Sequence, residues 1–214
     1  MKKSIYFILI SLFLTWTAHS QDFPSQIWHN GKVFLTSGEV HEGKVKYDLE
    51  TNIVQLQNKT IETFSAASIS HFEIFDEYYG GIRIFYSLPY AMNSDYKVPI
   101  FFELLTEGED ITLLCREYIT VDNRGWNNMG MRGMYMNPMW GPPMMGQNRL
   151  AFEFYFLTDR EIQKYSQKKR ELFNFMDDKS AEVRLYMRKN RLSHDRRGDL
   201  LRITAYYNQL KQNS

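Results

Sequence analysis

Short runs of alternating apolar and polar residues fill the chain from Ile27 to about Tyr118. Turn residues, such as Ser37-Gly38 and Asn58-Lys59, separate one run from the next. An apolar residue at every second position is typical of a strand with one buried face, and turns at this spacing connect antiparallel neighbours. We therefore expect an antiparallel sheet over this part of the chain.

One further strand is predicted at 149–157. Its four large apolar residues share one face: Leu150, Phe152, Phe154 and Phe156. Since an apolar face must be covered, we expect the core of the sheet itself to cover it. Many short strands favour a small barrel or sandwich, or two barrel-like halves that meet near Tyr79-Gly80-Gly81.

From Asp159 the apolar spacing changes to that of a helix. A first helix is predicted from four residues near one helical stripe: Ile162, Tyr165, Leu172 and Met176. Ser180 is expected to cap a second helix, and Asp199 to begin a third. Short helices with one apolar stripe must pack on each other, on the body or on a partner. The predicted fold is α+β, with a mainly β body over 21–158 and a tail of three helices over 159–214.

The first twenty residues have the composition of a secretory signal peptide. Lys2 and Lys3 precede an uncharged apolar run, and the small residues Ala18 and Ser20 follow it. The run is shorter than the roughly 20 apolar residues that cross a membrane, and no later segment resembles a span. We expect cleavage after Ser20 and a location in the periplasm or on the outer cell surface.

Charge is distributed unevenly between the two parts of the chain. Residues 159–214 carry 14 basic and 8 acidic side chains, whereas residues 22–158 carry 10 basic and 17 acidic ones. The asymmetry indicates that the tail and the body attract each other, or that the tail meets an acidic surface. Acidic residues interspersed in the tail, together with the export signal, argue against nucleic acid as a partner.

Segments from both parts of the chain resemble exported β-rich proteins of the Bacteroidota. The segments that carry the resemblance are Gly31-Lys32-Val33-Phe34-Leu35, Gly43-Lys44-Val45-Lys46-Tyr47-Asp48, Phe64-Ser65-Ala66, Phe101-Phe102-Glu103-Leu104-Leu105, and the tail segments 183–192 and 199–208. The resemblance implies a bacterial envelope location and a β body with a helical tail. The group has no assigned activity, so the resemblance implies no catalytic residue.

Residues 123–148 form a methionine-rich segment that matches no part of that resemblance. It contains seven of the eleven methionines, and its Gly, Pro and Asn residues predict a long loop between two strands. Thioethers are soft ligands, so Met129, Met131, Met134 and Met136 could hold Cu(I) in an export compartment. The alternative is a loop that uses methionine for adaptable contacts.

Motifs for catalysis are absent from the sequence. It has no nucleophile elbow, phosphate-binding glycine loop or dinucleotide fingerprint, and its histidines lack the spacing of a zinc site. The single cysteine, Cys115, lies in a predicted strand and is expected to be a buried, inert thiol. Six carboxylates could pair across strands, but the sequence alone does not establish whether any two lie at working distance: Glu73, Asp76, Glu77, Glu103, Glu107 and Asp110.

These features favour an exported, non-catalytic binding or interaction protein of the bacterial envelope. Its partner would be an envelope protein or a surface ligand. The alternative is a periplasmic protein that handles Cu(I) through the methionine-rich segment.

Overall fold

The computed structural model describes residues 22–92, 95–122, 147–159 and 161–212. Ten strands are formed by these residues: β1 His29–Leu35, β2 Val40–Asp48, β3 Ile53–Gln57, β4 Ile61–Ser65, β5 Ile69–Asp76, β6 Gly81–Tyr90, β7 Val98–Thr106, β8 Thr112–Asp122, β9 Gln147–Thr158 and β10 Glu161–Tyr165. The helices are η1 Pro24–Gln26, α3 Lys169–Phe175, η2 Asp177–Lys179, α4 Ser180–Asn190 and α5 Arg197–Gln212.

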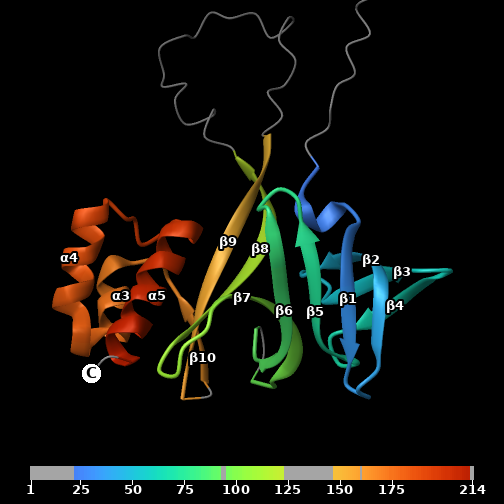
Figure 1. Ribbon diagram of the computed structural model, residues 1–214, viewed down its shortest axis with the longest axis horizontal. Helices are drawn as coiled ribbons and strands as arrows, with labels where there is room; N and C mark the ends of the chain where they lie inside the picture. The colour runs from blue at the N-terminus through green and yellow to red at the C-terminus, as the bar shows by residue number, and fades with distance from the viewer. Residues whose placement is uncertain (1–21, 93–94, 123–146, 160, 213–214) are drawn as a thin grey trace, which may run out of the picture.

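All ten strands belong to one antiparallel sheet in the order β10-β9-β8-β7-β6-β5-β1-β2-β3-β4. The three α-helices lie at the end of the sheet that contains β8, β9 and β10, and β1–β4 lie at the other end (Figure 1). The predicted α+β class, with a mainly β body and a helical C-terminal region, is confirmed. The described strands do not close into a barrel, because β10 and β4 remain the two edges of the sheet.

The N-terminal core lies between β1–β7. Alternate residues of these strands are buried together, as the period of two predicts. The buried members are Val33, Val45, Tyr47, Leu49, Val54, Leu56, Ala66, Ile69, Phe72, Ile74, Phe85 and Phe101.

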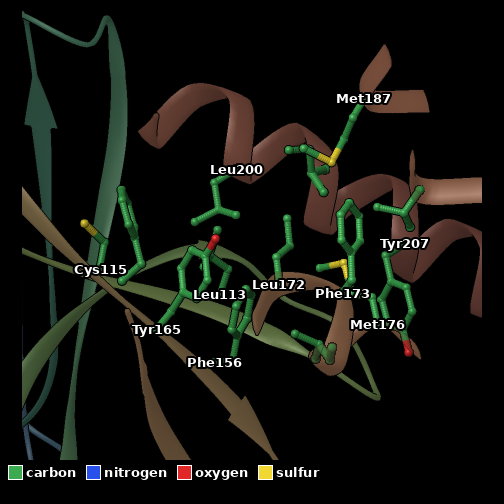
Figure 2. Packing of buried hydrophobic residues seen from close by; sticks show 14 residues of the cluster. Leu113, Cys115, Phe156, Tyr165, Leu172, Phe173, Met176, Met187, Leu200 and Tyr207 are labelled. Carbon is green, nitrogen blue, oxygen red and sulfur yellow. The ribbon is translucent and has the colours of Figure 1, made fainter. Parts of the chain in front are cut away.

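A second core joins β8–β10 to the helices (Figure 2). Phe154 and Phe156 of β9 pack against apolar residues of all three helices, among them Leu172 and Ile203. The apolar face of β9 is thus covered mainly by the helical tail. The expectation that the sheet's own core covers this face was wrong, because the sheet stays open and the tail folds back on it.

The first predicted helix was wrong at its start. Residues Glu161–Tyr165 form β10, which pairs antiparallel with β9, and the helix begins only at Lys169. Asp159 has a φ of 45°, the left-handed conformation that tight hairpin turns use and that Asp tolerates. The hairpin buries Tyr165 in the second core. The residues at 162 and 165 are three apart, a spacing that also fits a helical stripe, and this is why the pattern predicted a helix.

The other two helices begin close to their predicted positions. Ser180 is the first residue of α4, and Lys179 occupies the N-cap position without a side-chain cap hydrogen bond. Helix α5 begins at Arg197, two residues before Asp199. Among the described residues, no helix is long and apolar enough to cross a membrane.

His71 lies on the face of the sheet opposite the N-terminal core, between the rings of Phe34 and Tyr86. The ring centroids are 4.0 Å and 5.4 Å from that of His71. Burial lowers the pKa of His71, which is about 6.5 in an unfolded chain. The neutral ring therefore stabilises the fold above about pH 6.5, and this contribution is lost as the pH falls below that value.

Acidification is expected to destabilise the wild-type protein more than the His71→Phe variant, which keeps the ring stack without a titrating group. The measurement is the urea midpoint of each protein at about pH 7.5 and about pH 5. An equal loss in both proteins would contradict a role for His71 in this pH dependence.

Candidate functional site

A buried cluster of charged residues surrounds Arg83 of β6. The Arg83 side chain is 3% exposed, and all five of its N–H donors are used. Nε and Nη2 donate to Glu103 over 2.8 and 2.9 Å, and Nη2 also donates to Glu117 over 2.8 Å. Nη1 donates to Asp76 over 2.8 Å and to the Tyr47 hydroxyl over 3.0 Å. We call these five residues the Arg83 cluster.

Strand register brings the cluster together. Phe85 lies opposite Glu103, and Glu103 lies opposite Cys115. Arg83 lies two residues before Phe85 on β6, and Glu117 lies two residues after Cys115 on β8. Side chains two residues apart on a strand point to the same face of the sheet, so Arg83 and Glu117 share the inner face, which faces the cores, with Glu103. The Arg83 cluster thus lies on the inner face between the N-terminal core and the core under the helices.

The helical tail also contacts this cluster. Arg197, the first residue of α5, donates from Nη2 to Glu103. The Tyr79 ring covers both guanidinium groups, with its centroid 5.0 Å from Arg83 and 4.3 Å from Arg197. The expected attraction between the acidic body and the basic tail is therefore realised in part through buried contacts.

Burial and the neighbouring charges shift the pKa values of three groups at this site. Burial opposes the charged form of Arg83, but the hydrogen bonds and charge of Glu103 raise its pKa. Burial raises the pKa of Tyr47 well above its usual range and that of Tyr79 to about 12. The buried charges are held as ion pairs, with Arg83 bound to three carboxylates and Arg197 to one of them.

A cleft of about 610 Å³ opens beside the cluster, and we call it the β8 cleft. Its walls are β2, the β2–β3 turn and β3 on one side, and residues 117–119 of β8 on the other, with η1 at one end. Tyr47 and Glu117 both line it, and the Tyr47 hydroxyl donates to Glu117 over 2.5 Å. The cluster therefore joins the two walls of the cleft at this point.

The cleft forms where β7 and β8 separate. Pairing between them ends at Glu103 and Cys115, whereas β8 continues to pair with β9 as far as Asp122. The β2–β3 turn enters the gap, where Asn52 Oδ1 accepts from the Phe101 amide over 3.1 Å. Asn52 has a φ of 55°, a conformation that Asn tolerates better than most residues.

Arg116 fixes the β2–β3 turn in that position. Its Nη1 donates to Asn52 Oδ1 over 3.1 Å and to the Phe101 carbonyl over 2.5 Å, and its Nη2 donates to the Leu49 carbonyl. The turn and β8 are thereby held apart at a defined separation. The cleft is a built feature of the fold.

One edge of β8 is free along this cleft. The backbone N–H and C=O of Phe101 point from β7 toward β8. Those of Glu103, two residues further along β7, point the same way and meet Cys115, its partner on β8. Because the direction repeats every second residue of an antiparallel ladder, positions 117, 119 and 121 of β8 turn their N–H and C=O groups toward the gap, as Cys115 does toward β7. Among the described residues these groups have no hydrogen-bond partner.

The sequence-predicted site residues have different outcomes. Met129, Met131, Met134 and Met136 lie outside the described residues. The described part of the chain contains no group of three or more His, Cys, Asp and Glu side chains that could hold a metal ion. Cys115 is buried as predicted, and burial raises the pKa of its thiol.

Two of the six candidate carboxylates, Asp76 and Glu103, are brought together, both on Arg83. Glu117 and Arg83 itself were not among the residues predicted from the sequence. A signal for them existed, because each charge occupies a position two residues from a buried apolar one on the same strand, Cys115 and Phe85 respectively. A charge on the apolar face of a strand requires a partner of opposite charge on a neighbouring strand.

No protein family, curated protein or solved structure matches this chain. The resemblance to exported proteins of the Bacteroidota therefore stays a prediction. Function must be argued from the geometry of the site.

Proposed function

We propose that this chain is a binding protein that holds an extended polypeptide segment in the β8 cleft by strand addition. The observation that carries the proposal is the edge of β8 from residue 117 onward, which pairs with no strand of the described residues on the β7 side. Residues 117–119 of this edge line a cleft kept open by Arg116 and the β2–β3 turn. An unpaired strand edge offers alternating donors and acceptors, and these are what another extended chain requires.

The dimensions of the site suit such a ligand. Six residues of β8 extend over about 20 Å, at roughly 3.3 Å per residue. Main-chain hydrogen bonds supply affinity in strand addition, and side-chain pockets on alternate residues supply specificity. The β8 cleft combines such an edge with a volume of about 610 Å³, within the range of ligand pockets.

Charge favours a basic segment as the ligand. The lining of the cleft includes the exposed carboxylates of Asp48 and Glu50 and the partly buried Lys46. A neighbouring pocket contains Glu50, Glu117 and Arg116, together with Glu153, which is paired with Lys164. We expect peptides with Lys or Arg at the positions that face Asp48 and Glu50 to bind more tightly.

The predicted signal peptide assigns this binding to the cell envelope. Three features agree with an exported scaffold that captures an extended segment of another envelope protein. They are the predicted signal peptide, the lack of catalytic motifs in the sequence and the free edge of β8. A second copy of this chain is the competing occupant, and sedimentation equilibrium of the protein alone distinguishes the two.

The test is selection of a displayed library of random ten-residue peptides, about the length of a natural strand, against the protein, followed by titration of the selected peptides. We expect Val121→Pro to weaken binding by about tenfold or more, because by the alternation of the ladder it removes an N–H on the free edge of β8, directed away from β9. Val121 is 52% exposed, so Val121→Ala, which keeps the N–H, is the matched control and should bind normally.

Amide chemical shifts provide the second measurement. Bound peptide is expected to shift the amides of residues 117–122 and those of the β2–β3 turn. Selected peptides that bind both variants alike, or that shift only other amides, would contradict strand addition to β8.

A further inference from the structure

A second pocket lies in the helical tail, far along the chain from the residues of the β8 cleft. It has a volume of about 290 Å³, and we call it the α3–α4 pocket. Its lining residues are Lys169, Phe173, Arg184, Met187, Arg188, Arg191 and Leu192. Four of these seven are cationic, and the other three are apolar.

The four cations have no carboxylate partner among the described residues. None of them forms an ion pair with a carboxylate of the described residues, whereas Arg197 and Lys211 of the same tail do. Arg184 and Arg188 are four residues apart on α4, so their side chains emerge on one side of the helix, and Arg191 at its C-cap lines the same pocket. Like charges at this spacing repel, and an anion between them would relieve the repulsion.

The arginines are also partly fixed in place. The Arg184 guanidinium lies over the buried ring of Phe173, 3.8 Å from its centroid. Arg191 has a φ of 55° at the end of α4, where its amide donates to the Arg188 carbonyl. Glycine or asparagine is usual in this left-handed position, so an arginine there is a strained choice that points to a role for its side chain.

We propose that the α3–α4 pocket binds a phosphate group. Three guanidinium forks and an ammonium match the several oxygens of a phosphate, which a guanidinium can bind through two parallel N–H donors. A single carboxylate carries one negative charge against four cations, whereas a phosphate monoester carries about −1.5 to −2. The phosphate belongs either to a phospholipid headgroup or to a soluble phosphate ester, which share this chemistry.

Two probes distinguish these sources. The first is inorganic pyrophosphate, titrated by calorimetry in a phosphate-free buffer. The second is cosedimentation with phosphatidylcholine vesicles that contain or lack phosphatidic acid. Binding of pyrophosphate without vesicle binding indicates a soluble phosphate ester, and binding only to the vesicles with phosphatidic acid indicates a headgroup. Either result supports the pocket as a phosphate site.

The variant Arg188→Gln/Arg191→Gln is expected to weaken whichever binding is observed by about tenfold or more. Both side chains are exposed, so the fold should persist, and circular dichroism checks it. The control Lys44→Gln/Arg202→Gln removes the same charge from exposed positions outside the pocket and should bind like the wild type. Failure of both probes to bind, or an equal loss in both variants, would overturn the proposal.

Discussion

Replacing Arg83 with methionine is expected to lower the free energy of unfolding by about 3–5 kcal/mol, the usual result of breaking a buried ion pair on one side. Arg83 is 3% exposed and satisfies Asp76, Glu103 and Glu117 at once, so its loss leaves three buried carboxylates without their common partner. Urea denaturation at neutral pH measures the change.

Two further variants separate charge from geometry in the Arg83 cluster. Arg83→Lys keeps the charge but has three donors instead of five, so its loss should be intermediate. Arg197→Met removes a cation that is 18% exposed and forms an ion pair with Glu103 alone among the carboxylates of the cluster, so its loss should be smaller. A loss of less than about 1 kcal/mol for Arg83→Met would show that the cluster contributes little, contrary to the general rule for such pairs.

Much of the fold could be predicted from the sequence, since it depends on local patterns. The alternating runs form strands, and the helices α4 and α5 begin within two residues of their predicted starts. The error at β10 has a physical reason. Ile162 and Tyr165 have a helical spacing, but their strand is selected by pairing with β9, a tertiary contact that a local pattern does not contain.

The candidate site could be predicted much less well. The Arg83 cluster unites residues from β2, β5, β6, β7 and β8, and the register that aligns them is set by the whole sheet. The β8 cleft depends on the separation of β7 from β8, which Arg116 and Asn52 stabilise across 64 residues of sequence. No local pattern encodes that separation. The arginine spacing on α4 was visible in the sequence, but the lack of partners was not.

Shortening Leu200 to alanine is expected to lower the free energy of unfolding by about 2–5 kcal/mol, as for other fully buried leucines. Leu200 of α5 is 0% exposed and packs in the same core as Leu113 and Phe156 of the sheet (Figure 2). Leu185→Ala on α4 is the matched control, since Leu185 is 63% exposed and should change stability by less than about 0.5 kcal/mol.

The outcome decides whether the tail is part of the folded unit. If Leu200→Ala lowers the midpoint of one cooperative transition that probes of sheet and helices report together, the tail and the body unfold as one. That result is expected because Phe154, Phe156 and Tyr165 are buried in one core with residues of all three helices. A separate early transition of the helices, with the sheet unaffected, would instead make the tail a detachable module. The α3–α4 pocket would then be free to act independently of the β8 cleft.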